Sequence, residues 1–249
     1  MSFLEPEVVF DSKFRFDVAL TTVCRIGRRH AERIGEIGYL GLSLHERIDL
    51  FCRPADDEQL GSVTSLSVNV NKVATLRNTR EIGHPSPEWA ARTALVAGAD
   101  GVTVHPRPDG RHILRSDAAA MAGLYDAFPK AEDNIEGNLA HGLIELVEEF
   151  RPVQATLVPD GPDVFTSNQG WDFRAQATEL AEAIARLHAV GARVVLFADP
   201  DPDAMAHAAA TGADRVELYT EPYAVTEPRS QQRSKQLKRY RLTAIAARD

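Results

Sequence analysis

The stretch GADGVTVHPRPDGRHI, residues 98–113, decides the fold of this chain. Its apolar run Val102–Val104 predicts a short strand with His105 at the carboxyl end, and a polar loop with further basic side chains follows at once. Pro106 and Pro108 stiffen that loop, because each proline fixes its own φ angle and favours an extended predecessor. Two imidazoles and two guanidiniums at a strand end indicate a site for an anionic substrate, although an exposed basic loop would have the same composition.

A glycine followed by a β-branched run recurs along the chain, in GADGVTV from residue 98, GARVVLF from 191 and GADRVEL from 212. The glycine suits the left-handed position that ends a helix, and the run after it suits a strand. The expected strands are Leu66–Val70, Val102–Val104, Asp133–Glu136, Gln154–Val158, Arg193–Ala198 and Arg215–Tyr219.

Helices are expected between these strands, each with one apolar stripe. Ser86 and Pro87 are typical N-cap and first-turn residues, so they predict a helix that Gly98 ends. Three further stripes have helical spacing: Met121, Leu124, Tyr125 and Phe128; Leu139, Leu143, Leu146, Val147 and Phe150; and Ala177, Leu180, Ala181, Ile184 and Leu187.

Strands that alternate strictly with helices predict parallel pairing, which leaves a doubly wound sheet or a (β/α) barrel. Polar residues stand at the carboxyl ends of the expected strands, where a barrel gathers its active site. They are Asn69, His105, Glu136, Asp160, Asp199 and Tyr219. No GxGxxG follows the first strand and the sequence has no P-loop, which disfavours a nucleotide-binding sheet. The sequence therefore predicts an α/β fold, a TIM-type (β/α) barrel with about six βα units.

The composition indicates a soluble globular protein. The 249 residues carry a net charge of −8 and are 44% hydrophobic, so nucleic acid and membranes are not expected as partners. Cys24 and Cys52 lack the spacing of a zinc site and fit a reduced compartment. No run reaches the roughly 18 apolar residues of a membrane span, and the acidic N-terminus is unlike a signal peptide.

Residues 1–64 read differently from the rest, so we expect an atypical N-terminal extension before a barrel domain at 65–249. EVVF at residues 7–10 fits a short strand, and residues 52–62 read as a linker. Helical spacing relates Phe16, Leu20, Val23 and Cys24. Arginines follow at positions 25, 28, 29 and 33, and a solvated helix surface explains them better than a nucleic-acid site.

Several long motifs, in their order along the chain, resemble the pyridoxine 5'-phosphate synthase family. They are SVNVNKVATLRNTR (67–80), GADGVTVHPRPDGRHI (98–113), NIEG (134–137), TLVPD (156–160), TSNQGWDF (166–173) and VELYTEPYA (216–224). The resemblance begins at about Leu66 and reaches the helix expected at the end of the sequence.

This resemblance implies a (β/α)8 barrel that works in the cytoplasm as a homo-octamer, with no metal or organic cofactor. The implied reaction condenses two small phosphorylated substrates, 1-deoxy-D-xylulose 5-phosphate and 3-amino-2-oxopropyl phosphate, to pyridoxine 5'-phosphate, phosphate and water. An amine must attack a carbonyl, and protons must then move as water and phosphate leave. General acid–base groups and anion-binding side chains suffice for that chemistry.

The resemblance also implies three catalytic residues. His105 in TVHPR matches a general base, and an imidazole suits the task because it titrates near neutrality. Glu136 in NIEG matches a second base, which burial can make more basic; an ion pair with an arginine at the barrel mouth is the structural alternative. Glu217 is expected to point inward beside Tyr219, and it matches an acid proposed to stabilise the transition state.

Six further residues match the family's substrate-binding positions: Asn69, Asn71, Arg80, Arg107, His112 and Thr166. Guanidiniums offer paired donors to phosphate oxygens, while amides and hydroxyls orient the substrate. Asn71 and Lys72 depart from the family pattern, in which many members have Asp and His.

The family pattern continues into two further strands with an NAGH-type segment and a Gly-His pair, and this sequence contains neither. A barrel with only six units has two unpaired sheet edges. Either the N-terminal segment, in a permuted arrangement, or a second chain could cover them. The alternative function is therefore a catalytically incomplete paralogue that binds phosphorylated ligands or co-assembles with an intact synthase. A third reading, another phosphosugar enzyme on the same barrel, lacks a good Schiff-base lysine.

Overall fold

The structure is a computed structural model that describes residues 21–24, 64–161 and 167–248. Within this part of the chain, seven strands form one sheet in sequence order. They are β1 (Thr21–Cys24), β2 (Thr64–Asn69), β3 (Gly101–Val104), β4 (Glu132–Gly137), β5 (Gln154–Leu157), β6 (Arg193–Ala198) and β7 (Arg215–Leu218). Every neighbouring pair from β2 to β7 is parallel, as the alternation of strands and helices predicts.

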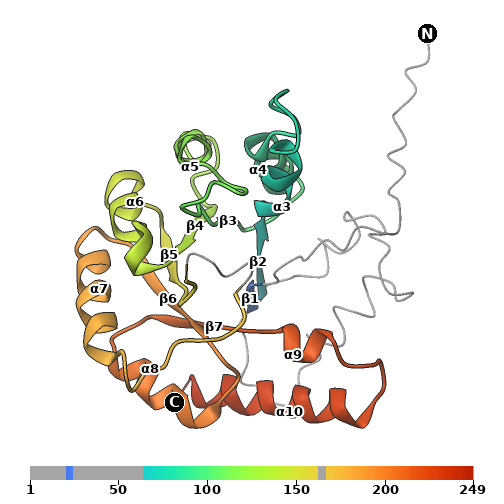
Figure 1. Cartoon of the computed structure of the whole chain (residues 1–249), viewed down its shortest axis with the longest axis vertical. Helices are drawn as coiled ribbons and strands as arrows, with labels where there is room; N and C mark the ends of the chain where they lie inside the picture. Colours follow the sequence, from blue (N-terminus) through green and yellow to red (C-terminus); the bar gives the residue numbers. More distant parts are fainter. Residues whose placement is uncertain (1–20, 25–63, 162–166, 249) are drawn as a thin grey trace.

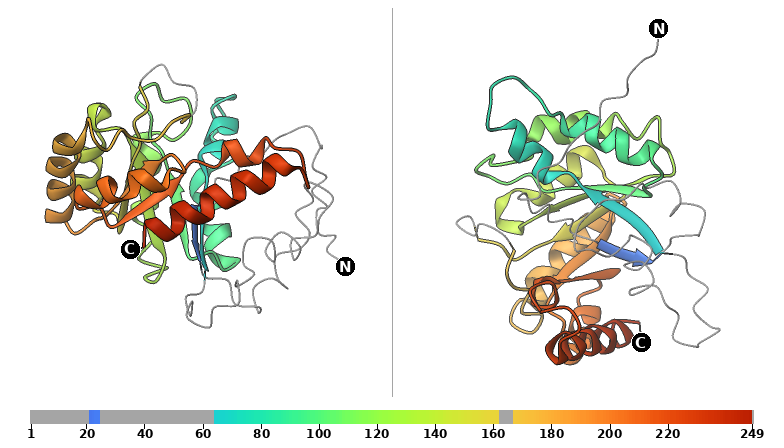
Figure 2. Two further views of the ribbon diagram at one scale, coloured as in Figure 1. Left: turned by 90° about the horizontal axis from the view of Figure 1, so that it is seen from below. Right: turned by 90° about the vertical axis from the view of Figure 1, so that its right-hand side faces the viewer.

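Helices connect the strands and cover the outside of the curved sheet (Figure 1). They are α3 (Asn71–Arg77), α4 (Pro87–Val96), α5 (Arg115–Ala122), α6 (Leu143–Phe150), α7 (Ala177–Ala189), α8 (Met205–Ala210), α9 (Glu221–Ala224) and α10 (Gln231–Ala246), with 3-10 turns η1 (Leu139–His141) and η2 (Pro202–Ala204). The parallel strands from β2 to β7 curl into part of a barrel (Figure 1 and Figure 2). The predicted TIM-type (β/α) fold with six units is therefore confirmed, as an incomplete barrel.

Local sequence signals account for many of these boundaries. The Ser86 hydroxyl accepts a hydrogen bond from the backbone N–H of Trp89 at 3.2 Å, so α4 begins where the N-cap signal predicts. Gly98, Gly191 and Gly212, which open the three recurring motifs, have φ angles of 103°, 88° and 88°. Each takes the left-handed conformation that a side chain would disfavour, which confirms the helix-to-strand role expected for this glycine.

Two expectations from helical spacing are wrong. The stripe from Met121 to Phe128 predicts one helix, but α5 ends at Ala122 and turns follow, because Gly123 has a low helix propensity. Val23 and Cys24 lie in β1 rather than in a helix, and β1 pairs antiparallel with β2. Its three β-branched residues suit a strand, and the β2 edge supplies backbone partners for it.

The N-terminal segment thus extends the sheet beyond β2 without adding a parallel barrel strand there. The expected strand at residues 7–10, the linker at residues 52–62 and the arginines at 25–33 lie outside the described residues. The division of the chain at residues 64 and 65 stays a prediction.

A ladder of buried polar side chains crosses the inside of the curved sheet. The hydroxyls of Ser67 and Thr103 lie 2.8 Å apart, and the Asn134 amide donates to the Thr103 hydroxyl at 3.3 Å. The Thr156 hydroxyl donates to the Asn134 carbonyl oxygen at 3.0 Å. This ladder fixes four neighbouring strands relative to each other, and residues two positions further along share its inner face.

Charged side chains close the amino-terminal end of the same inner face. Arg193 pairs with Glu132 and donates from Nε to the Gln154 side-chain oxygen at 3.1 Å. Arg215 donates to that same oxygen at 3.2 Å. The carboxyl end of the sheet is the one that carries the hollow described below.

No helix among the described residues is both long and apolar enough to cross a bilayer.

Candidate active site at the carboxyl ends of the strands

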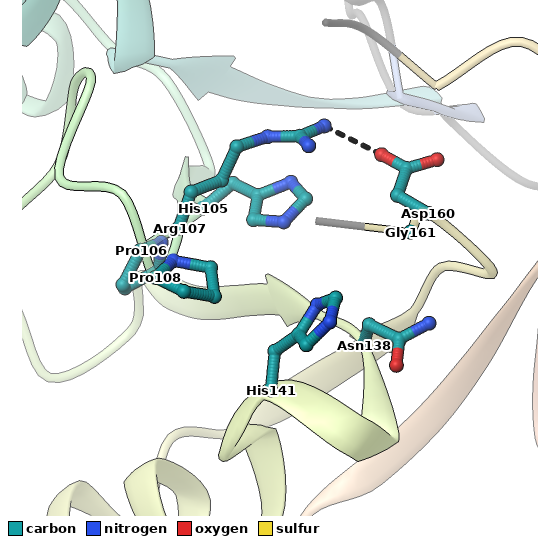
Figure 3. A pocket seen from close by; sticks show the side chains of 8 residues that line it. All are labelled: His105, Pro106, Arg107, Pro108, Asn138, His141, Asp160 and Gly161. Carbon is teal, nitrogen blue, oxygen red and sulfur yellow. Dashed lines mark hydrogen bonds and ion pairs between the residues drawn. The ribbon is translucent and has the colours of Figure 1, made fainter. Parts of the chain in front are cut away.

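A small hollow, open to solvent, lies at the carboxyl ends of β3, β4 and β5 (Figure 3). The lining residues come from the three loops that follow these strands. They are His105, Pro106, Arg107, Pro108, Asn138, His141, Asp160 and Gly161. The stretch that begins after β3 therefore forms one wall, as the sequence predicts for a barrel mouth.

His105 is held in place by its backbone. Its N–H donates to the Asn71 side-chain oxygen at 2.8 Å, and the N–H of Asn71 donates to the Asn69 side-chain oxygen at 2.9 Å. The chain of bonds begins where β2 ends and passes through the first turn of α3 to the end of β3. Asn69 and Asn71 are thus brought to the mouth, where their described bonds orient His105.

His105 and Glu136 face each other across the mouth. His105 Nδ1 lies 3.7 Å from Glu136 Oε2, and each residue is only 7% exposed. Burial lowers the pKa of His105 well below its usual value of 6.5, and the nearby Arg107 charge lowers this pKa further. Burial, and then the Glu217 and Asp160 charges, raise the pKa of Glu136 well above its usual value of 4.5. Burial therefore favours the neutral imidazole of His105 and the protonated carboxyl group of Glu136.

Glu217 points inward from β7, as its position two residues after Arg215 predicts. Its Oε2 atom is buried and has no hydrogen-bond partner among the described residues. Burial raises the pKa of Glu217 to about 7, so this carboxyl group titrates at physiological pH. Because its charge acts on Glu136, the two carboxyl groups influence each other's protonation.

Arg107 forms a buried ion pair across the mouth. Its Nη2 atom donates to Asp160 Oδ2 at 2.5 Å, and the two side chains are 7% and 3% exposed. The Ser167 hydroxyl donates to the same carboxylate oxygen at 2.5 Å. Figure 3 shows the pair spanning the hollow above His105. The ion pair suggested from the sequence for Glu136 is thus formed in this structure by Asp160.

The loop that carries His112 is anchored from α3. Arg77, which pairs with Asp117, donates to the His112 backbone carbonyl at 3.2 Å, and the Asn78 amide donates to it at 2.8 Å. The His112 ring packs edge-on against the His105 ring, with centroids 5.9 Å apart. Burial, and then the charge of Arg107, lower the pKa of His112 to about 4, so its ring is neutral at pH 7.

Of the nine predicted site residues, His105 and Arg107 line the hollow itself, and Arg80 and Thr166 have no described contact with either of them. Arg80 is exposed in the turn after α3 and does not line the hollow. Thr166 lies outside the described residues. Lys72, which departs from the family pattern, is exposed at the start of α3.

Sequence reasoning missed the roles of four residues at the mouth. Asp160 stands at a strand end, but its pairing with Arg107 spans 53 residues and leaves no local pattern. Ser167 lies in the motif TSNQGWDF, but its bond to Asp160 spans seven residues and no local pattern predicts it. Asn138 follows NIEG directly and His141 comes three residues later. Both therefore lie just after the end of β4, and this position could have predicted that they line the mouth. Within the described residues, no three His, Cys, Asp or Glu side chains are grouped to hold a metal ion.

The profile of the family described as "Pyridoxal phosphate biosynthesis protein PdxJ" matches residues 66–249. The chain belongs to this family. A pyridoxine 5'-phosphate synthase of Albidiferax ferrireducens is 54% identical over 189 residues, covering 74% of this chain and 75% of the relative. Synthases of the same name from Brucella anthropi and Allorhizobium ampelinum are 51% and 49% identical, over 73% of this chain and 75% and 74% of theirs.

Among solved structures, a chain described as "QR15, an Aldolase" superposes with a TM-score of 0.40 and 13% identity, covering 63% of this chain and 77% of its own. A likeness this weak adds nothing to the assignment. Membership of the PdxJ family, together with the six parallel strands, accounts for the barrel without it.

Proposed function

We propose that this PdxJ protein is a pyridoxine 5'-phosphate synthase. It would condense 1-deoxy-D-xylulose 5-phosphate with 3-amino-2-oxopropyl phosphate and release pyridoxine 5'-phosphate, phosphate and water. One observation carries the proposal beyond family membership: His105 and Glu136 face each other at 3.7 Å in the barrel mouth. The pair offers a neutral base and a protonated acid in one place, which is the equipment that a condensation with loss of water needs.

The first chemical step assigns one proton transfer to each residue. The substrate amine attacks the ketone carbon, forming a C–N bond, while the imidazole of His105 accepts the proton that the nitrogen gives up. The carboxyl group of Glu136 donates its proton to the carbonyl oxygen, which gives a carbinolamine. The proton held by His105 then passes to that hydroxyl group, which leaves as water, while the nitrogen gives its second proton to the Glu136 carboxylate and a C=N bond forms. Burial favours the form in which each side chain starts, the neutral imidazole of His105 and the protonated carboxyl group of Glu136.

Glu217 is proposed to assist from the opposite side of the mouth. With a pKa raised to about 7, it is ionised in part at neutral pH and can stabilise positive charge that develops on nitrogen. Its charge also raises the pKa of Glu136, which favours the protonated form of that residue in the first step. We assign Glu217 this electrostatic role rather than a proton transfer.

The anionic ends of the substrates are assigned to the basic wall of the mouth. Arg107 supplies a guanidinium, and the neutral His112 ring beside it supplies a polar contact. Asn69 and Asn71 are proposed to contact substrate at the edge of the same wall, and Arg80 and Thr166 keep the substrate-binding role that the family resemblance gives them. We further propose a homo-oligomer that works in the cytoplasm, to be tested by sedimentation and cell fractionation.

Incubation of the purified chain with both substrates tests the synthase activity, with formation of pyridoxine 5'-phosphate followed by its absorbance. We expect turnover that His105→Ala and Glu136→Gln each lower by roughly a hundredfold or more, while circular dichroism shows that the fold is unchanged. Arg111→Gln is the matched control, because this basic residue of the same loop pairs with Asp109 instead of lining the hollow. A folded wild-type chain that gives no product would contradict the proposal.

A further inference from the structure

The Arg107–Asp160 pair has an unusual position for an ion pair. It lies in the wall of the hollow, where the proposed function requires Arg107 to meet a phosphate group. A guanidinium buried without a counter-ion is strongly disfavoured, so a site that must be stable without substrate needs an internal anion. Asp160 supplies that anion, at 2.5 Å from the guanidinium.

The contacts around Asp160 would still hold its carboxylate if Arg107 moved away. The Ser167 hydroxyl donates to Oδ2 at 2.5 Å, so one strong bond to the carboxylate does not depend on Arg107. The other oxygen, Oδ1, is buried and accepts no hydrogen bond from the described residues. A carboxylate placed only for stability would be expected to use both oxygens, for example in a two-bond pair with the guanidinium. Arg107 and Asp160 are thus joined to each other by one hydrogen bond, so the exchange breaks one bond between these two side chains.

From this arrangement we propose that Asp160 is the internal counter-ion of the anion subsite. It neutralises Arg107 in the free protein and yields the guanidinium to the phosphate group of the substrate, while Ser167 continues to hold the carboxylate. Substrate phosphate thus binds by exchange for an internal carboxylate. Asp160 acts through Arg107 and is a positioning residue. The inference rests on the proposed function for the identity of the phosphorylated substrates.

If phosphate binds by this exchange, substitutions of Asp160 and Ser167 should change the affinity for phosphate in opposite directions. Asp160→Asn removes the competing charge and leaves the shape, so inorganic phosphate should bind about tenfold more tightly than to the wild type. Ser167→Ala removes the bond that holds the carboxylate after exchange, so phosphate should bind roughly three- to tenfold more weakly. A purely structural role for the pair predicts weaker binding in both variants, because each would loosen the mouth.

Titration calorimetry with inorganic phosphate on the full chain is the test, with Arg107→Ala as the control that should abolish binding. Thermal unfolding gives a second measurement: phosphate should raise the unfolding temperature of Asp160→Asn more than that of the wild type. Phosphate binding to Asp160→Asn that is equal or weaker overturns the proposal. If that variant does not fold, Ser167→Ala decides, and unchanged or tighter binding there overturns it.

The binding test and the turnover test separate the two proposals. Phosphate binding that survives Arg107→Ala overturns the anion subsite, and with it the exchange, whatever the activity. If the two variants change phosphate affinity in opposite directions but the wild type gives no product, the exchange is supported and the synthase activity is contradicted. Turnover by the wild type, with equal or weaker phosphate binding by Asp160→Asn, leaves the synthase standing and overturns the exchange. In an active enzyme, Asp160→Asn should lower KM for the phosphorylated substrate that Arg107 binds.

Discussion

His105 Nδ1 lies 3.7 Å from Glu136 Oε2, too far for a hydrogen bond and close enough for both atoms to touch one bound substrate. Burial acts on the two groups in opposite directions, lowering the pKa of the imidazole and raising that of the carboxyl group. Burial therefore favours the neutral form of both side chains, one of which is a base and the other an acid.

The pH dependence of kcat/KM should have an acid limb and an alkaline limb. On the acid side activity should fall as Glu217 gains its proton near 7, and fall again when His105 becomes protonated, well below 6.5; on the alkaline side it should fall when Glu136 loses its proton. Glu136→Gln should lower kcat by roughly a hundredfold or more and remove the alkaline limb. A variant that keeps the alkaline limb at its original position would show that another group is the acid.

Glu217 should make the folded chain less stable as the pH rises. Its pKa is about 7 in the folded state and about 4.5 unfolded, so between these values only the unfolded chain loses the proton. The penalty is absent below pH 4.5 and complete above pH 7. Taken as 7 minus 4.5 units at about 1.4 kcal/mol each, it is on the order of 3 kcal/mol. Glu217→Gln should therefore gain stability over the wild type at pH 8 but not at pH 4.

Urea unfolding of both proteins at pH 4, 6 and 8 measures this difference, because groups that do not interact with Glu217 cancel between them. Glu136, whose pKa the Glu217 charge raises, adds to the difference in the same direction. Aspartate at this position is the matched control, since it keeps the carboxyl group and should keep the pH dependence. A Glu217→Gln difference that is the same at all three pH values would contradict the raised pKa.

His112 should destabilise the folded chain in acid. Its pKa is lowered to about 4 from 6.5, so between these values the unfolded chain binds a proton that the folded chain does not. Stability is unaffected above pH 6.5 and is lost as the pH falls toward 4. His112→Gln should remove this loss, so its unfolding midpoint in urea should decline less between pH 7 and 5. His207, which lies outside the mouth on α8, is the control position, and His207→Gln should follow the wild type.

Much of the fold and half of the site could be predicted from sequence, because both depend on local patterns. β-Branched runs after helix-ending glycines predicted β3, β6 and β7, short runs between polar loops and helical stripes predicted β2, β4 and β5, and the alternation of strands and helices predicted their parallel pairing. His105 and Glu136 were predicted at the mouth because each ends or follows a strand, where a barrel converges. The predicted end of α5 was wrong, because the helical spacing of apolar residues continues past Gly123 into residues that pack on the core without being helical.

Contacts between distant segments could not be predicted in the same way. The pairing of Arg107 with Asp160 depends on how far two loops reach across the mouth, and several acidic residues were equally plausible partners by sequence. The bonds from Arg77 and Asn78 to the backbone of His112 involve a carbonyl, which every residue has. Such contacts depend on how the folded segments pack, and no local sequence pattern predicts them.

The spacing of β3 and β4 should be the most sensitive feature of the site. A Cβ atom at Gly101 would lie 2.4 Å from the backbone carbonyl oxygen of Glu132 on the neighbouring strand, so Gly101→Ala must push the strands apart. We expect a loss of about 2 kcal/mol or more in the free energy of unfolding. Gly123→Ala is the matched control, because its Cβ would have an ordinary contact at 3.7 Å and a helical φ of −70°.

Because His105 follows β3 and Glu136 lies in β4, the same displacement should change the 3.7 Å separation between them. Gly101→Ala should therefore lower kcat severalfold or more even at a temperature where urea unfolding shows the variant fully folded, since small misplacements of acid–base groups are costly. Gly123→Ala should keep the wild-type kcat and gain up to about 1 kcal/mol of stability. Equal kcat values in folded Gly101→Ala and the wild type would mean that the reaction does not depend on how β3 and β4 place these two side chains.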